Sequence, residues 1–109
     1  MTLRYRILAQ SNPPANNPTV LYTVPANTAT VISTLQICNL SGNTSTIRVS
    51  VATANAAIAN AQYLTYDTPI IGNDALSMTL GISLGNTDSM TISANTGNVA
   101  FSLFGSEIY

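Results

Sequence analysis

The chain has 109 residues, of which only 6% are charged, and its formal net charge is −1. It contains no His, Lys or Trp and a single Cys. Catalysis by proton transfer or by metal ions needs titrating or coordinating side chains, which are scarce in this composition. The three cations, Arg4, Arg6 and Arg48, are too few to form the basic face that binds nucleic acid. Enzymatic activity and nucleic-acid binding are therefore not expected.

The length and the hydrophobic share of 46% predict one domain, over residues 1–109, with one core. No stretch approaches the roughly 20 apolar residues of a membrane helix, so we expect no membrane partner. The N-terminal charges are not followed by the apolar region of a signal peptide, so we expect synthesis in a host cytoplasm.

The N-terminal segment alternates in polarity with a period of two residues. Leu3, Tyr5 and Ile7 alternate with Arg4 and Arg6, which predicts a strand whose apolar side chains face the core.

Residues 11–18 form an extended segment rich in Pro and Asn. Pro13, Pro14 and Pro18 fix φ and remove backbone donors, so the segment is predicted to be neither helix nor inner strand. A long extended segment is unusual inside a compact domain. We therefore expect it to reach a neighbouring subunit or the shell of a larger assembly.

Residues 19–24, 28–40 and 46–52 are rich in β-branched residues and predict three strands. Turn-forming residues 41–44 lie between the last two, which predicts that these two strands pair as an antiparallel hairpin. Residues 54–61 combine Ala with Asn and are interpreted as a loop with at most one helical turn.

The second half of the chain continues the strand-and-turn pattern. Further strands are predicted at residues 62–66, 76–84, around Met90 and Ile92, and at 99–103. Asp, Asn, Gly and Pro residues predict breaks at 67–69, 72–74, 85–88 and 95–98. About eight strands without helical periodicity predict an all-β fold, an antiparallel β-sandwich of jelly-roll or immunoglobulin-like topology.

Strict alternation also predicts which side chains form the core. These are Leu3, Tyr5, Ile7, Ile47, Val49, Val51, Leu76, Met78, Leu80, Met90, Ile92, Val99, Phe101 and Leu103.

Few side chains could carry chemistry. Asp74 and Asp88 lie at opposite ends of one predicted strand, so they cannot act as the paired carboxylates of a glycosidase. Cys38 lies in an apolar run without a His to activate it and is interpreted as a small core residue. We expect no catalytic, cofactor or metal site.

Binding surfaces are the more promising feature, because Tyr offers a large rigid contact area with a polar tip. The tyrosines are open to three interpretations, namely the rim of the core, a protein interface, or rings on which a sugar stacks. The candidate interface residues are Pro13, Pro14, Pro18, Tyr22, Tyr63, Tyr66 and Tyr109.

Two segments carry a resemblance to a known group of proteins. They are VPANTATVISTLQICN at residues 24–39, and residues 80–108, which begin LGISL and end FGSEI. Together they resemble small β-rich virion structural proteins of tailed bacteriophages, including cyanophages. The resemblance implies a place in the virion and other virion proteins as partners, such as the major capsid protein or neck and tail proteins.

The first functional hypothesis is therefore a phage virion structural protein that acts as a capsid cement or decoration protein. By analogy with decoration proteins we expect a homo-oligomer, with a trimer favoured. Many weak contacts repeated over a symmetric shell would then sum to strong attachment. Two alternatives stay open, a neck, tail or baseplate component and a carbohydrate-binding attachment module.

Overall fold

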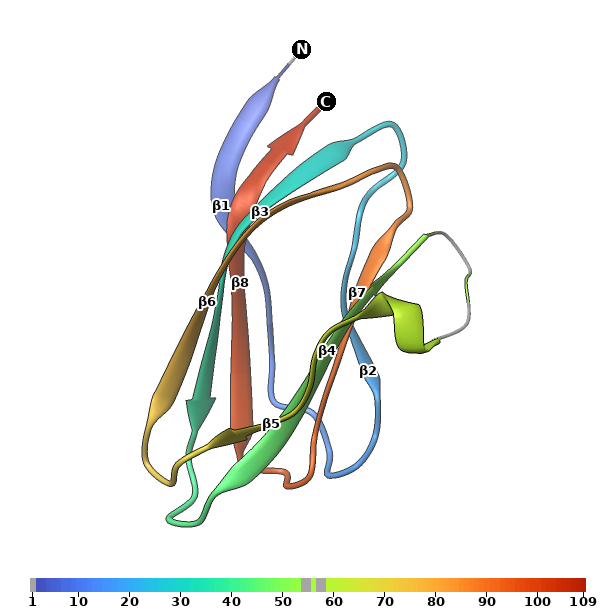
Figure 1. The fold of residues 1–109 in the computed structure, drawn as a ribbon. Helices are drawn as coiled ribbons and strands as arrows, with labels where there is room; N and C mark the ends of the chain where they lie inside the picture. Colours follow the sequence, from blue (N-terminus) through green and yellow to red (C-terminus); the bar gives the residue numbers. More distant parts are fainter. Residues whose placement is uncertain (1, 54–55, 57–58) are drawn as a thin grey trace.

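The protein is described by a computed structural model over residues 2–53, 56 and 59–109, and it forms two packed sheets of four antiparallel strands each (Figure 1). The first sheet has the strand order β1-β8-β3-β6 and the second β2-β7-β4-β5. The strands are β1 (Leu3–Ser11), β2 (Thr19–Thr23), β3 (Ala29–Asn39), β4 (Ser45–Ala52), β5 (Tyr63–Ile70), β6 (Ala75–Leu84), β7 (Ser89–Ala94) and β8 (Val99–Ile108). The predicted β-sandwich is confirmed.

The strand order selects the jelly roll from the two predicted topologies. β1 pairs with β8, β2 with β7, β3 with β6 and β4 with β5, which is the order of one long hairpin rolled into two sheets. The predicted hairpin between residues 28–40 and 46–52 is wrong. β3 and β4 lie in different sheets, because the turn between them carries the chain across the sandwich.

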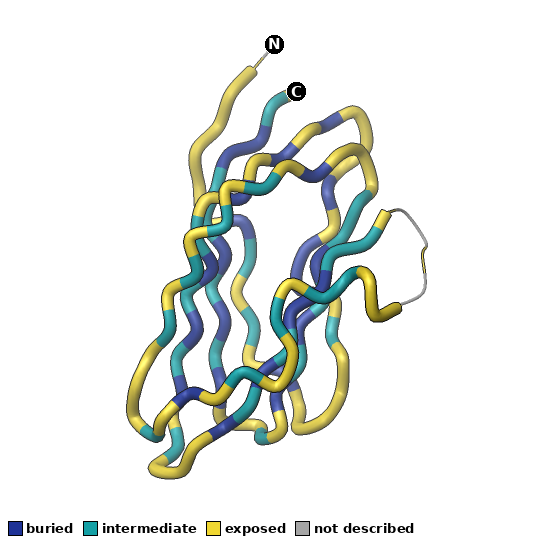
Figure 2. The backbone as a smooth tube through the Cα atoms, in the orientation of Figure 1, coloured by how far each residue is buried: buried dark blue, intermediate teal, exposed yellow. Residues whose placement is uncertain are grey.

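The core lies between the two sheets, and buried residues alternate with more exposed ones along most strands (Figure 2). Seven predicted core residues are buried there, Ile47, Val49, Met90, Ile92, Val99, Phe101 and Leu103. Four more are partly buried against that core, Val51, Leu76, Met78 and Leu80. β3 adds Ile32, Leu35 and Ile37, which are fully buried.

A row of irregularities crosses the first sheet near its middle. Leu8 of β1 and Ser33 of β3 are extra residues beside Phe104 of β8. In β6, two residues, Leu80 and Gly81, lie opposite the single residue Ser33. In Figure 1, β1, β3 and β8 change direction near this level. Bulges of this kind bend a strand and change the face on which its side chains lie. We call this row the bulge row.

Gly105 allows the strands to approach closely at the bulge row. A Cβ atom on Gly105 would lie 2.2 Å from the carbonyl oxygen of Val31 and 3.1 Å from Cδ1 of Leu8. Only glycine fits this position without moving the backbone of β3.

The bulge at Leu8 overturns the predicted face of β1. Leu8 is buried, whereas Leu3, Tyr5 and Ile7 are 47%, 79% and 52% exposed. Residues before the bulge place even-numbered side chains inward, so the three odd-numbered apolar residues lie on the outer face of the sheet. The sequence pattern missed this switch because apolar residues occur at both parities, at Ile7 and at Leu8.

β5 also differs from the expected pattern. Residues 67–69 do not break it, because the strand continues through Asp67 and Pro69 to Ile70. Asp67 adopts a left-handed conformation, with φ 51°, inside a bulge opposite Arg48. Pro69 is tolerated because β5 is an edge strand, where a backbone donor can be absent.

The proline-containing segment was expected to project from the domain, but it packs against its own chain. Pro13 is buried, and the backbone N–H of Asn16 donates to the carbonyl of Ala94 at 2.8 Å. The Asn12 amide, with its nitrogen toward these acceptors, donates to the carbonyls of Gly97 and Val99 at 2.9 Å each. The segment is therefore bound to the β7–β8 turn of its own chain. The predicted loop at residues 54–61 lies partly outside the described residues, and its described end is a single 3-10 turn, η1 (Asn60–Gln62).

Truncating a side chain on the core face of the first sheet should have a larger effect on stability than truncating one on its outer face. Leu103→Ala should lower the free energy of unfolding by about 2–5 kcal/mol, because it opens a cavity in the core. Ile7→Ala should change it by less than about 0.5 kcal/mol, because Ile7 is on the outer face. Urea unfolding followed by circular dichroism measures both values. Equal losses in the two variants would show that the face of β1 is misassigned.

Candidate functional site

A hydrogen-bonded cluster joins the two sheets near the chain termini. The Tyr22 hydroxyl of β2 donates to Oε2 of Glu107 on β8 at 2.5 Å and lies 3.0 Å from the Thr30 hydroxyl of β3. Arg6 of β1 adds an ion pair, with Nη1 3.5 Å from Oε1 of Glu107. Glu107 is only 5% exposed, and such a buried charge requires partners of this kind.

Tyr22 has a structural role in this cluster. Its side chain is 8% exposed, so among the candidate interface residues it is not available at the surface of the chain. Burial, followed by the hydrogen bond to Glu107, raises the pKa of Tyr22 from 10.0 to about 12. The protonated phenol is thus the form that the folded chain holds.

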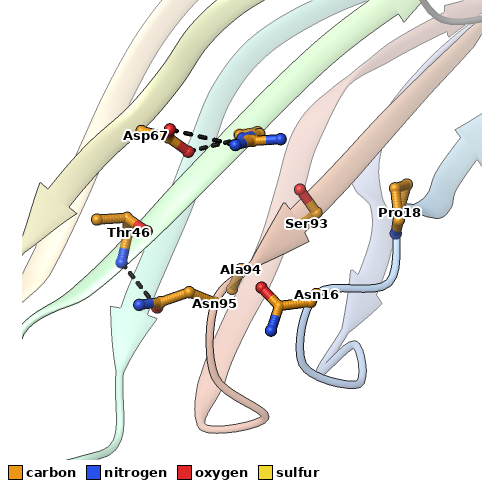
Figure 3. Close-up of a pocket in the computed structure, with 8 residues that line it drawn as sticks. Asn16, Pro18, Thr46, Asp67, Ser93, Ala94 and Asn95 are labelled. Carbon is orange, nitrogen blue, oxygen red and sulfur yellow. Dashed lines mark hydrogen bonds and ion pairs between the residues drawn. The ribbon is translucent and has the colours of Figure 1, made fainter.

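A groove of about 360 Å³ lies on the outer face of the second sheet (Figure 3). The proline-containing segment forms one wall through Asn16 and Pro18, and Asp67 of β5 lies at the other. The groove is lined by Asn16, Pro18, Thr46, Arg48, Asp67, Ser93, Ala94 and Asn95. Half of these side chains are polar and uncharged, and the eight residues come from three strands and two loops.

Two charged residues line the groove, Arg48 and Asp67, and their side chains form an ion pair. Nε of Arg48 donates to Oδ1 of Asp67 at 2.6 Å, and Nη2 donates to Oδ2 at 3.2 Å. This two-point hydrogen bond fixes both planar groups and lowers the pKa of Asp67 below its ordinary value. The bulge in β5 is what turns Asp67 toward Arg48.

Two tyrosines extend this arrangement along β5. The guanidinium carbon of Arg48 lies 4.1 Å from the ring centroid of Tyr66. The ring of Tyr63 meets that of Tyr66 edge to face, with centroids 4.9 Å apart. We call Arg48, Tyr63, Tyr66 and Asp67 the arginine–tyrosine cluster.

An apolar surface lies on the other sheet, near the chain termini. Leu3, Tyr5 and Ile7 of β1 lie on the outer face there, and Val31 of β3, which is 36% exposed, lies across β8 from Tyr5. A shallow depression between Tyr5, Val31 and Phe104 is part of the same surface. Contiguous apolar surface of this kind often marks an interaction site. We call Leu3, Tyr5, Ile7 and Val31 the apolar strip.

The candidate interface residues therefore fall in several places. Tyr63, Tyr66 and Pro18 lie in or near the groove region, and Pro14 is exposed on the adjoining segment. Tyr109 lies at the other end of the molecule, 45% exposed, with the guanidinium carbon of Arg4 5.6 Å from its ring centroid.

Other functional residues were missed by the sequence analysis. The sequence analysis assigned Leu3, Tyr5 and Ile7 to the core. It also did not predict that Arg48 and Asp67 form an ion pair. A sequence signal for the second pair is Asp before Thr-Pro in an edge strand, where a bulge is tolerated.

The chain matches no protein-family model, and no curated protein matches its sequence. Among residues 2–53, 56 and 59–109, no group of three or more His, Cys, Asp or Glu is placed to hold a metal ion. Within the same ranges, no helix has the length and apolar character needed to cross a membrane. The groove and the apolar strip are therefore the surfaces from which a function can be argued.

The pKa of Tyr22 predicts a loss of stability at high pH. Since the folded pKa of about 12 lies above the unfolded value of 10.0, the unfolded chain releases this proton first. The stabilisation is complete below pH 10 and is lost as the pH rises toward 12. Tyr22→Phe should lower the free energy of unfolding at neutral pH by about 1–3 kcal/mol.

Urea unfolding of both proteins at a series of pH values measures this contribution. The difference between wild type and Tyr22→Phe should shrink above pH 10. A difference that stays constant through that range would contradict the assigned hydrogen bond.

Proposed function

We propose that this chain is a structural subunit of a bacteriophage particle and acts as a capsid cement or decoration protein. The observation that carries the proposal is the apolar strip, which exposes Leu3, Tyr5 and Ile7 on a surface with very few charges. Folded monomers seldom leave large adjoining apolar side chains exposed without a partner. The resemblance of residues 24–39 and 80–108 to small virion proteins supports a particle as the place of that partner.

The fold is compatible with this role. Jelly rolls occur in viral capsid domains and in lectins, so the topology alone leaves both functions open. A sparsely charged surface favours docking, because few charged groups have to lose water without gaining a partner. Repetition of modest contacts around a symmetric shell then gives strong overall attachment. Such a protein acts as a homo-oligomer, with a trimer favoured.

Incorporation into particles tests the proposal. Ile7→Ser should reduce the number of copies per particle several-fold, because it removes apolar contact area from the strip. Ile71→Ser is the matched control, because Ile71 is 69% exposed but lies in the β5–β6 turn. Quantitative mass spectrometry of purified particles, relative to the major capsid protein, measures the occupancy.

Electron microscopy of the same particles locates the subunit. Copies over the whole shell support a cement or decoration role, whereas a single axial ring would assign the chain to the neck or tail. Absence from purified particles would contradict the proposal as a whole.

A carbohydrate-binding attachment module is the second candidate, and the arginine–tyrosine cluster favours it. A sugar has apolar C–H faces that stack on aromatic rings, and neighbouring hydroxyls that match planar two-point donors and acceptors. Tyr66 is 54% exposed beside Arg48 and Asp67. Asn95 lies across the groove from them. Ligand sites typically combine such rings with a few fixed polar groups.

Binding to immobilised bacterial polysaccharides tests this second function. Wild type should bind at least one polysaccharide, and Tyr66→Ala should reduce that binding about tenfold, since one stacked ring contributes roughly one factor of ten. Tyr5→Ala is the matched control, because it removes an exposed tyrosine from the other sheet. Equal losses in both variants, or no binding to any polysaccharide, would count against the groove as a sugar site.

A further inference from the structure

The first half of β1 has a free edge whose backbone groups can be assigned. Thr2 and Tyr109 exchange both of their backbone hydrogen bonds. In an antiparallel pair such exchanging positions alternate with positions whose N–H and C=O point away. With Arg4 opposite Glu107 and Arg6 opposite Gly105, the arginines bond to β8. The backbone groups of Leu3, Tyr5 and Ile7 therefore point outward from the sheet edge.

No described strand pairs with this edge, since β1 is the last strand of its sheet. The three residues with outward backbone groups also supply three of the four side chains of the apolar strip. An incoming strand would thus bond to Leu3, Tyr5 and Ile7 and place its own side chains beside theirs on the outer face. Apolar residues suit those positions.

The opposite face of the same edge is basic. Arg4 and Arg6 point to the inner side, where Arg6 makes one ion pair with Glu107 and keeps 45% of its side chain exposed. A guanidinium has five donors, so Arg6 can accept a second carboxylate as a partner. Arg4 is also exposed, beside the ring of Tyr109. Acidic residues therefore suit the alternate positions of an incoming strand.

A second copy of β1 is a poor occupant of this edge. Antiparallel self-pairing in which Tyr5 bonds to Leu3, Tyr5 or Ile7 of the second copy sets Arg4 against Arg4, Arg4 against Arg6, or Arg6 against Arg6, respectively. Such like-charged pairs directly opposite one another are destabilising. Parallel self-pairing in register also places each arginine beside its counterpart. The arginines thus protect the edge from association with its own kind.

The rest of this chain also lacks a suitable strand. Its four carboxylates are Asp67, Asp74, Asp88 and Glu107, and no two of them are separated by a single residue. A strand with carboxylates at alternate positions must therefore come from another polypeptide.

We propose that the free edge of β1 receives a strand of a different protein, in which apolar residues alternate with Asp or Glu. The strand places its carboxylates beside Arg4 and Arg6 and its apolar side chains beside Leu3, Tyr5 and Ile7 of the apolar strip. This is recognition by strand addition, in which backbone hydrogen bonds supply affinity and alternate side chains supply specificity. The identification of that protein as a particle component rests on the proposed function, whereas the edge chemistry does not.

Labelled synthetic peptides test the edge directly. The probes are the capped peptides TVEVEVT, TVQVQVT and TVKVKVT, and fluorescence anisotropy measures their dissociation constants. The glutamate peptide should bind at least about tenfold more tightly than the lysine peptide, with the glutamine peptide between them. Added salt should narrow this difference, because the charges are exposed.

Two variants separate the backbone and charge contributions. Tyr5→Pro removes an outward N–H without removing a hydrogen bond to β8, so it should abolish binding of all three peptides while the domain stays folded. Tyr5→Ala keeps that N–H and should retain the order of the peptides. The double variant Arg4→Gln with Arg6→Gln should bind all three peptides equally. Ile71→Ser, in the β5–β6 turn, is the control and should leave the affinities of all three peptides unchanged.

The outcomes are separable from those of the particle experiment. Equal affinity for the glutamate and lysine peptides, or binding that survives Tyr5→Pro, overturns the proposed strand addition. Self-association that Tyr5→Pro abolishes would show that a second copy occupies the edge and also overturns it. Selective peptide binding by a protein that is absent from particles would reject the proposed function and leave the edge assignment standing.

Discussion

The bulge row across β1, β8, β3 and β6 is the constraint on which the rest of the molecule depends. On the side of the row away from the chain termini, the inward residues of β1 and β3 are odd-numbered, such as Ala9 and Leu35. On the side toward the termini, they are even-numbered, such as Arg6 and Ile32. The change of face sends the apolar residues at the start of β1 outward and their arginine neighbours inward. Gly105 is required at the same place, because β3 approaches too closely for a side chain.

The buried carboxylate of Glu107 would be unfavourable without the cluster that surrounds it. Glu107 lies inward on β8 and accepts from Tyr22, which belongs to the opposite sheet. The ion pair with Arg6 then gives the buried carboxylate a second partner. Polar contacts thus close the end of the sandwich where the apolar core gives way to the termini. The strand edge beside that end is at once apolar on one face and basic on the other.

The two sheets therefore present different surfaces. The outer face of the second sheet is polar and holds its charges in a fixed pair, Arg48 with Asp67, beside stacked tyrosines. The outer face of the first sheet, near the termini, is apolar and ends at an unpaired strand edge. Strand addition at β1 and contacts between copies must use different parts of the surface, since like charges oppose self-pairing at that edge.

The number and type of the strands follow from the sequence alone, because two-residue alternation and turn chemistry are local properties. The bounds of β5 and β8 did not, since both strands continue beyond the predicted ends. Ile47, Val49 and Phe101 could be placed in the core for the same reason. Pairing between strands that are distant in the sequence decided which strands lie in the same sheet. The turn after β3 could have joined two strands of one sheet, yet it crosses between sheets, which local residues do not specify.

The functional surfaces were likewise decided by tertiary structure. Tyr22 and Glu107 are 85 residues apart, so their hydrogen bond exists only once the sheets have packed. Arg48 and Asp67 meet because a bulge in β5 lies opposite Arg48, and register is a property of the pair of strands rather than of either one. The face of β1 depended on a single extra residue, Leu8, whose effect on alternation becomes visible only against its partner β8.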